Sequence, residues 1–290
     1  MRECFSTFSH RVCLAFVMLV AYTICAKSEN IVFEDSQVKQ VCLSKWDADE
    51  DGELSIEEAA QVESLGTTFY MNKSLSAFTE LQYFTGLTTI DEYAFAESTI
   101  TSVVIPGNVK QIGSYAFDKC YSLTRVTVNE GVETVGCFAF VGPLEFLSLP
   151  SSITYLDHQF VDPFVGSNTT TSGGMSFPDG TFYLYAHGDS PSACHYNAFY
   201  RLFGVSYLVV PFGKKADYSV AMGWKWFYKV LEYGDVNRDG RVDVADLTLL
   251  IAYIGGREHT DMDALIADIN GDGVLDGEDV SQLCQYLLGS

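Results

Sequence analysis

The chain has 290 residues, with 38 acidic and 17 basic side chains, and a formal net charge of −21 at pH 7. A charge of this sign argues against nucleic acid and against an anionic membrane surface as partners, because both are negatively charged. Hydrophobic residues make up 48% of the chain and aromatic residues 14% of the chain, which is too high for a disordered protein. The composition therefore predicts a folded protein.

The amino terminus has the pattern of an export signal. Two arginines precede an apolar run from Val12 to Ala26, which is short for a membrane span but suits the core of a signal peptide. We expect residues 1–26 to be a signal peptide and the protein to be secreted or held at the cell surface. An N-terminal membrane anchor is the alternative. A lipid anchor on Cys25 is less favoured, because Ile24 is larger than the residue that normally precedes a lipidated cysteine.

Five cysteines follow the predicted signal peptide, and no two of them form a C-x-x-C pair. An odd number without paired spacing indicates neither a disulfide framework nor a zinc site. We expect most of them to be small buried core residues.

The region 27–75 is predicted to be helical around an acidic loop, DADEDGELSIEE, which we call loop N (Asp47–Glu58). It satisfies the full EF-hand-like pattern D-x-D-x-D-G-x5-E, whose oxygens suit Ca²⁺. The predicted donors are Asp47, Asp49, Asp51, the Glu53 carbonyl, Ser55 and Glu58. Residues 36–46 and 56–64 read as flanking helices. The alternative is a cap for the following domain that keeps this geometry without an ion.

An internal repeat fills the middle of the chain. Its turns end in Ala-Phe or in a lone Phe, at Phe95, Phe117, Phe140, Phe160 and Phe199. Short strand-like patterns follow from Ile100, Leu123, Leu144 and Val205. A unit of about 22 residues with one strand and one inward aromatic cannot bury its apolar face alone, so stacked units must form a solenoid. The Gly-, Ser- and Thr-rich residues 162–181 break the period and read as an inserted loop.

These repeats resemble the BspA-type leucine-rich repeats of bacterial surface proteins, whose unit reads roughly I-x-x-x-A-F-x-x-C-x-x-L-x-x-V-x-I-P. Cys120 lies at the cysteine of that pattern. The resemblance covers residues 76–234, including a closing strand-and-helix cap. We expect Trp224, Trp226 and Tyr228 to pack in this cap; the alternative is that they stack on sugar rings. It implies a scaffold that displays a binding surface, often for adhesion, with a glycan or a host protein as ligand.

The tail, residues 235–290, holds 12 acidic and 3 basic residues and two twelve-residue loops. Loop 1 is DVNRDGRVDVAD (Asp235–Asp246), and loop 2 is DINGDGVLDGED (Asp268–Asp279). Oxygens at loop positions 1, 3, 5, 7, 9 and 12 suit Ca²⁺, and glycine at position 6 allows the sharp turn. The predicted donors are Asp235, Asn237, Asp239, the Arg241 carbonyl, Asp243 and Asp246 in loop 1, and Asp268, Asn270, Asp272, the Val274 carbonyl, Asp276 and Asp279 in loop 2.

Each tail loop runs into an apolar helix, and this duplicated loop-helix unit resembles a type I dockerin domain. The resemblance implies folding on calcium and binding to a cohesin-like module. Loop positions 10 and 11, which commonly set partner choice in that family, correspond to Val244 and Ala245 and to Gly277 and Glu278. The two pairs differ, which argues against symmetric dual binding. The alternative is that the loops only cap the solenoid. Because the solenoid needs no metal, we expect the full chain to melt in two steps.

The sequence therefore predicts an α+β protein, in which a short-stranded leucine-rich-repeat solenoid lies between a helical N-terminal cap and a small all-α dockerin-like domain. Its histidines lack the spacing of a metal site or a catalytic triad, and we expect no enzyme activity. The favoured function is an exported calcium-binding scaffold attached to a cohesin-type partner or a cell-surface assembly. The alternatives are a surface adhesin with purely structural calcium modules and an accessory subunit in polysaccharide degradation, for which a separate catalytic domain is not expected.

Overall fold

The computed structural model describes residues 29–163, 182–200, 202, 206–257, 262, 264–269 and 274–289. The predicted signal peptide and residues 164–181 of the predicted inserted loop lie outside this set.

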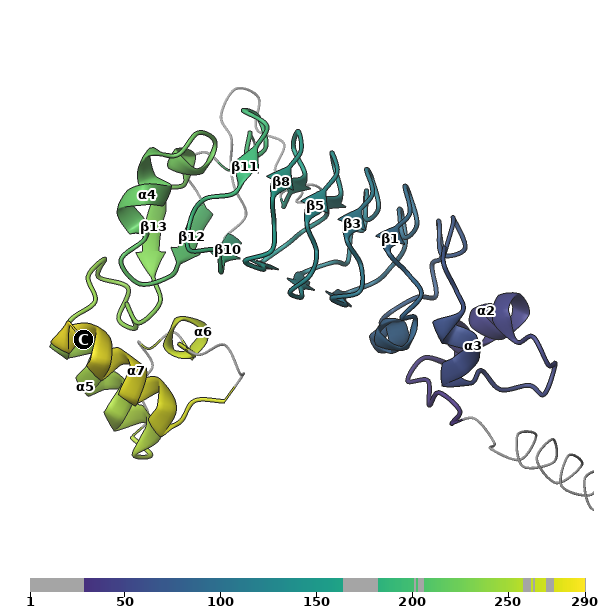
Figure 1. Cartoon of the computed structure of the whole chain (residues 1–290), viewed down its shortest axis with the longest axis horizontal. Coiled ribbons are helices and arrows are strands. Elements are labelled where there is room, and N and C mark those ends of the chain that lie inside the picture. The colour runs from purple at the N-terminus through teal and green to yellow at the C-terminus, as the bar shows by residue number, and fades with distance from the viewer. Residues whose placement is uncertain are drawn as a thin grey trace, which may run out of the picture.

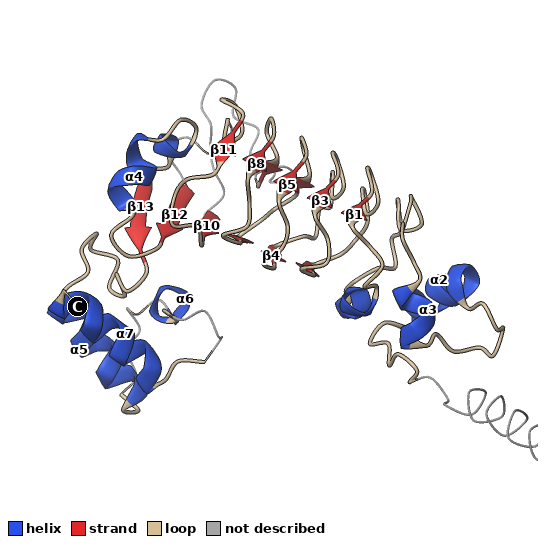
Figure 2. Ribbon diagram, viewed as in Figure 1, coloured by secondary structure: helices blue, strands red, loops and turns tan. Residues whose placement is uncertain are grey.

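A parallel β-solenoid forms the centre of the described chain (Figures 1 and 2). Its larger sheet has the order β13-β12-β10-β7-β4-β2, with bounds β2 Ser102–Ile105, β4 Arg125–Val128, β7 Phe146–Leu149, β10 Phe182–Ala186, β12 Ser206–Val210 and β13 Lys229–Glu232. A second sheet has the order β1-β3-β5-β8-β11, with bounds β1 Thr89–Ile90, β3 Gln111–Ile112, β5 Thr134–Val135, β8 Tyr155–Leu156 and β11 Ala193–Cys194. Two further strands, β6 Phe140–Val141 and β9 Val161–Asp162, pair with each other.

Helices lie at both ends of the solenoid (Figure 2). The N-terminal ones are α2 Ser36–Trp46, α3 Ile56–Ala60 and the 3-10 helix η1 Thr79–Tyr83, and the C-terminal ones are α4 Lys215–Val220, η2 Trp224–Trp226, α5 Val244–Ile254, α6 Ala264–Ala267 and α7 Gly277–Leu288. α2 has the predicted bounds, whereas α3 ends four residues earlier than predicted. The chain there turns into the first coil of the solenoid and buries Val62 and Leu65.

The repeated phenylalanines form the core, as the sequence predicts. Phe95 stacks on Phe117 with ring centroids 4.9 Å apart, and Phe117 stacks on Phe140 at 5.5 Å. All three are fully buried, and so are the alanines that precede them. The small alanine leaves room for the ring beside it, so each coil can approach the next one closely.

The structure adds a strand that the repeat pattern did not reveal. β10 pairs with β7 on one side and β12 on the other, so it belongs to the coil whose turn contains Phe160. The inserted residues separate this turn from its strand. For that reason Phe160 and Phe199 lie 39 residues apart, about two repeat lengths.

The tail packs against the C-terminal end of the solenoid (Figure 1). α5 and α7 lie side by side over a small core of their own, formed by Val236, Leu250, Ala267 and Leu283. Ile266 of α6 leaves that core and is fully buried in a cluster with the solenoid residues Tyr185, Val209, Leu231 and Tyr233. The tail is therefore attached by an apolar contact as well as by the chain.

Candidate functional site

The first and last carboxylates of loop 1 are both buried. Asp235 is 1% exposed and Asp246 is 0% exposed. Asp235 accepts a hydrogen bond from the backbone N–H of Gly240 at 3.0 Å, and Asp246 accepts one from the N–H of Asp243 at 2.9 Å. Burial raises the pKa of Asp235 to about 6 and also raises the pKa of Asp246. Two buried carboxylates in one short loop require protons or a cation, so this donor set fits Ca²⁺.

The other loop 1 donors lie on its more exposed side. Asn237 Oδ1 accepts from the N–H of Asp239 at 2.8 Å, and Asp239 accepts from the N–H of Arg241 at 2.9 Å. Asp243 accepts from the N–H two residues later and caps α5. Gly240 has φ +94°, a conformation that residues with a side chain rarely adopt. The loop backbone is therefore bent by its own donor side chains, and the remaining lone pairs of their oxygens can coordinate an ion.

Loop 2 repeats the arrangement at its C-terminal end. Its described donors are Asp268, Val274, Asp276 and Asp279, whereas Asn270 and Asp272 lie outside the described residues. Asp279 is 0% exposed and accepts from the N–H of Ile269 at 2.8 Å and from the N–H of Asp276 at 3.0 Å. Asp276 caps α7 in the same way that Asp243 caps α5. The two loops therefore share a buried last carboxylate that accepts from position 9.

Loop N brings three of its predicted donors together. Carboxylate oxygens of Asp47, Asp49 and Glu58 lie within 4.8 Å of one another. Glu58 accepts from the N–H of Ser55 at 2.9 Å, which is again position 12 accepting from position 9. One Asp47 oxygen accepts from the N–H of Gly52 at 3.0 Å, whereas Oδ1 is buried and has no hydrogen-bond partner among the described residues. A buried carboxylate oxygen without a donor fits a cation ligand.

Of the remaining donors of loop N, Asp51 is arranged as in loop 1, whereas the side chains of Glu53 and Ser55 make contacts of their own. Asp51 accepts from the N–H of Glu53 at 2.8 Å, as position 5 does from position 7 in loop 1. The Glu53 side chain pairs with Lys39 at 2.6 Å, which leaves its carbonyl as the predicted donor. Ser55 Oγ donates to Glu58 at 2.8 Å. Loop N therefore has the loop 1 template with a serine where loops 1 and 2 have aspartate.

The four predicted partner-binding residues are exposed. Val244 is 67% exposed, and Ala245, Gly277 and Glu278 are exposed as well. The helices behind them differ. The exposed large apolar residues of α5 are Val244, Ile251, Tyr253 and Ile254, whereas α7 exposes Gly277, Glu278, Ser281 and Gln285 along most of its length and large apolar residues only near its C-terminal end, at Tyr286 and Leu288. Of the two helices, α5 has the more apolar surface.

Several contacts hold loop 1 against the solenoid, and the sequence analysis did not anticipate them. Lys215 Nζ donates to the Gly240 carbonyl at 2.8 Å, and Lys229 Nζ donates to the Arg238 carbonyl. The guanidinium of Arg238 lies 5.1 Å from the ring centroid of Tyr183. Gly240 and Arg238 are loop positions 6 and 4. The lysines therefore do not bind the Arg241 carbonyl at position 7, which is the predicted calcium donor. The sequence feature that could have predicted these contacts is the presence of Lys215 and Lys229 in the closing cap of an otherwise acidic chain.

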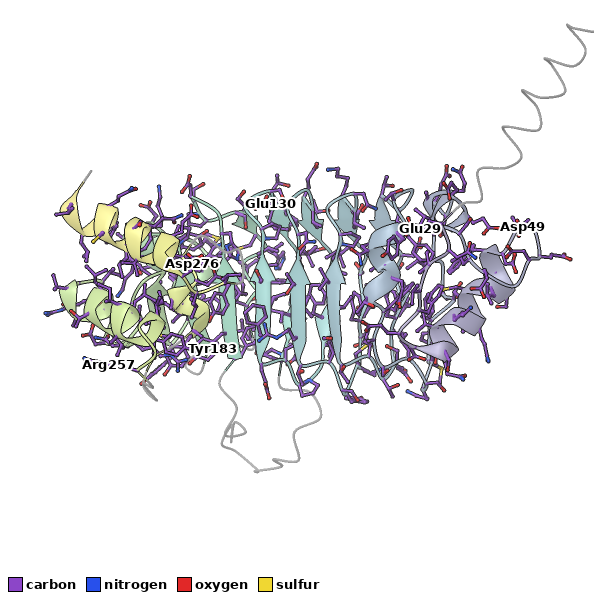
Figure 3. The ribbon with its side chains drawn as sticks, turned by 90° about the horizontal axis from the view of Figure 1, so that it is seen from below. Glu29, Asp49, Glu130, Tyr183, Arg257 and Asp276 are labelled. Carbon is purple, nitrogen blue, oxygen red and sulfur yellow. The ribbon has the colours of Figure 1, made fainter. Side chains whose placement is uncertain are left out.

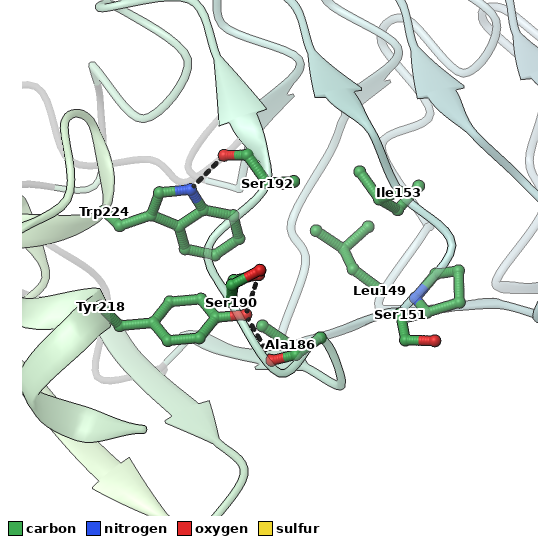
Figure 4. A pocket seen from close by; sticks show the side chains of 10 residues that line it. Leu149, Ser151, Ile153, Ala186, Ser190, Ser192, Tyr218 and Trp224 are labelled. Atoms are coloured by element: carbon green, nitrogen blue, oxygen red, sulfur yellow. Dashed lines mark hydrogen bonds between the residues drawn. The ribbon is translucent and has the colours of Figure 1, made fainter. Parts of the chain in front are cut away.

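The closing cap buries one of its predicted aromatics and exposes two. Trp224 is 2% exposed and donates its indole N–H to the Ser192 carbonyl at 3.0 Å (Figure 4). The cavity beside it is about 10 Å³, which is about the space that one water molecule needs. Trp226 and Tyr228 are 47% and 63% exposed, so the expectation that they pack inside the cap is wrong. Each lies at an end of η2 or just beyond it, and only Trp224 faces inward.

A buried polar network lies where the tail meets the solenoid. His187 Nε2 and Ser148 Oγ are 2.9 Å apart, and His187 Nδ1 and the Tyr233 hydroxyl are also 2.9 Å apart. Burial lowers the pKa of His187. Ser148 is 8% exposed and Tyr233 is 6% exposed. This arrangement joins β7 to the residues that directly follow β10 and β13.

Comparison with known families assigns two parts of the chain. Residues 54–163 match the BspA type leucine rich repeat region, in six copies, and residues 233–288 match the dockerin type I domain. Both resemblances are confirmed, although the repeat match begins at residue 54 rather than 76 and ends at residue 163 rather than 234. The chain thus joins a BspA-type repeat region to a dockerin type I domain, two types that are non-catalytic and are typical of extracellular or surface proteins. A search among curated proteins finds no match. Within the described residues, no helix has both the length and the apolar character needed to cross a membrane.

Proposed function

We propose that this protein is an exported, non-catalytic calcium-binding scaffold that attaches through its dockerin to a cohesin-type partner or surface assembly. The proposed domains are a signal peptide at 1–26, an EF-hand-like helical region at 27–75, the repeat solenoid at 76–234 and the dockerin at 235–290. The observation that carries the proposal is the exposure of the predicted partner residues in a tail that is packed on the solenoid. Ile266 is buried against the solenoid, while Val244 is 67% exposed.

Calcium is the proposed cofactor of loops 1 and 2, with loop N as a third site. The support is the donor chemistry: each loop ends in a carboxylate that accepts from position 9, and loop 1 buries two carboxylates within one turn. Bound Ca²⁺ supplies positive charge to these oxygens. The protein residues set the loop shape, and we expect the tail to order fully only with the ion.

The proposed partner surface is α5 rather than α7. A protein interface needs an apolar centre, which Val244 and Ile251 offer on α5. On α7 the exposed large apolar residues, Tyr286 and Leu288, lie only near its C-terminal end. The surrounding tail carries 12 acidic and 3 basic residues, so a partner with a basic rim fits best.

Partner capture by the full-length protein tests this function. Val244→Asp with Ala245→Asp should leave calcium affinity and the circular dichroism spectrum nearly unchanged, but should abolish binding to cohesin modules presented in calcium. The matched control is Gly277→Asp with Ser281→Asp on α7, which adds the same charge and should retain capture. Retention by the first variant, or equal loss in both, would contradict an α5-centred dockerin interface.

The second candidate is an adhesin whose calcium modules are structural. The contact of Ile266 with Tyr185 and Leu231 favours it, because a tail that covers the end of the solenoid stabilises it whatever else binds. If no cohesin module binds the parent chain in calcium, while calcium still raises its melting temperature, this candidate takes first place. An accessory role in polysaccharide degradation is a third reading, supported only by the dockerin type.

A further inference from the structure

The first described residues of the chain lie against loop N as a short segment, which we call the strap (Glu29–Asp35). The backbone N–H of Ile31 donates to the Leu54 carbonyl at 2.8 Å, and the N–H of Ile56 donates to the Glu29 carbonyl at 2.9 Å. Leu54 and Ile56 are loop positions 8 and 10. The two bonds therefore flank position 9, which is a predicted calcium donor.

These bonds fix the part of loop N that carries its last two donors. Ser55, at position 9, lies between them and faces Asn30 in an antiparallel bridge. Ile56 begins α3, where a backbone N–H has no partner within the helix, so the strap carbonyl satisfies it. Glu58, at position 12, accepts from both the N–H and the hydroxyl of Ser55. The strap therefore sets the backbone on which positions 9 and 12 are placed.

Loop N uses the strap where loops 1 and 2 use each other. Val242 and Leu275, the position 8 residues of loops 1 and 2, pack on one apolar cluster. Position 8 of loop N is Leu54, which is fully buried in the same core as Ile31. Figure 3 shows Asp49 of loop N at the end of the molecule opposite to the tail. The strap thus supplies loop N with the neighbour that the two tail loops supply to each other.

The far end of the strap is anchored on the first coil of the solenoid. The N–H of Glu34 donates at 2.6 Å to a carboxylate oxygen of Glu80, which belongs to η1 and is 2% exposed. Asp35 accepts from the N–H of Ser76 at 3.3 Å and from its hydroxyl at 3.1 Å. The strap therefore connects loop N to the solenoid through backbone and side-chain contacts at both of its ends.

We propose that the strap is part of the calcium site of loop N, and that it is held closed when the ion is bound. This inference rests on the proposed third calcium site. Loop N contains seven acidic residues and no basic one, so without a cation its carboxylates repel one another and strain the strap bonds. Calcium binding and strap closure then favour each other by the same factor. Calcium at loop N fastens the N-terminal segment to the solenoid.

Amide hydrogen exchange of Ile31 and Ile56 tests this coupling in the chain from Lys27 to Ser290. The background is Asp246→Ala with Asp279→Ala, so that calcium acts at loop N alone. If the strap opens only when the ion leaves, calcium a hundredfold above its dissociation constant slows exchange of both amides about a hundredfold. We expect a slowing of at least about tenfold, also in the parent chain, and none in the background when Glu58→Gln is added.

Calcium titration in the same background tests the reverse direction. A chain that begins at Val32 lacks both strap bonds and should bind calcium at loop N at least about tenfold more weakly. The matched control begins at Glu29, keeps both bonds and should bind as the parent does. Ile31→Ala removes the buried side chain but keeps the backbone bonds, so it should weaken binding less than the truncation.

Two results would overturn the proposal. They are equal exchange of the two amides with and without calcium, and equal calcium affinity in the chains that begin at Glu29 and at Val32. Either result leaves the third calcium site in place as long as the background binds one ion. If the background binds no ion, the third calcium site and the strap proposal fail together.

Discussion

Calcium should stabilise the end of the solenoid as well as the tail. Ile266 is buried among Tyr185, Val209, Leu231 and Tyr233, so unfolding the tail exposes apolar surface of the solenoid. The sequence alone predicts two separate melting steps. The structure instead favours linked melting of the tail and the C-terminal coils, because unfolding of either part removes the Ile266 contact and so lowers the stability of the other.

The size of the effect follows from binding linkage. A site filled at calcium a hundredfold above its dissociation constant adds about 2.7 kcal/mol to the free energy of unfolding. For a cooperative unit of 150–250 residues this raises the melting temperature by about 5–10 °C per site. If the tail melted alone, calcium at loops 1 and 2 would add no shift to the melting of the solenoid.

Tryptophan fluorescence can separate these cases, because the tail contains no tryptophan. In a background with Trp46→Phe and Trp226→Phe, the buried Trp224 reports only on the solenoid cap. We expect its melting midpoint to rise with calcium, and to rise little in the double variant Asp246→Ala with Asp279→Ala. That double variant leaves loop N intact, so any remaining shift measures loop N.

The interface variant Ile266→Ala should uncouple the two parts while calcium still binds the tail. Truncating a buried isoleucine costs about 2–5 kcal/mol, most of it here at the contact with the solenoid. A Trp224 midpoint that is the same in chelator and in calcium for the parent chain would refute the coupling.

Three further outcomes can be measured separately. Phe117→Ala should lower the free energy of unfolding in urea by about 3–5 kcal/mol, since the ring is fully buried between Phe95 and Phe140, whereas Tyr121→Ala, at a residue 54% exposed, should change it by less than about 0.5 kcal/mol. Burial lowers the pKa of His187, so the folded state binds fewer protons there than the unfolded chain. The stability that the neutral ring contributes should therefore be present above pH 6.5 and be lost as the pH falls below it. His187→Gln should flatten the pH dependence of the melting temperature in this range. Glu58→Gln should remove one calcium ion from the stoichiometry measured by titration, and an unchanged count would mean that loop N is only a cap.

Local chemistry made much of this fold predictable. An Ala-Phe turn followed by a short β-branched strand has one way to bury its ring, so the positions of Phe95, Phe117 and Phe140 followed from spacing alone. Loops 1, 2 and N were equally predictable, because the loop backbone requires a glycine at position 6 and a carboxylate at position 12.

Contacts between distant segments were not predictable in the same way. The inserted residues concealed β10, and without β10 the register that aligns Tyr183 with Phe146 and Tyr207 could not be drawn. In the sequence Ile266 is one apolar residue of a short helix, and the residues around it do not indicate that it packs on the solenoid. Arg238 occupies an unconstrained loop position, so its place above Tyr183 depends entirely on docking of the tail.

The tail can both cover the end of the solenoid and act as a dockerin, because different residues would serve the two roles. A parallel solenoid exposes an unpaired strand and apolar core at each end, so both ends need a cover. At the first end loop N does this, with Leu54 fully buried and its carbonyl accepting from the N–H of Ile31 at 2.8 Å. At the other end Ile266 and loop 1 lie against the last coils. A domain that buries Ile266 against the solenoid and leaves Val244 exposed can stabilise the scaffold and present a partner surface at once. Calcium would then act on stability and display through the same loop.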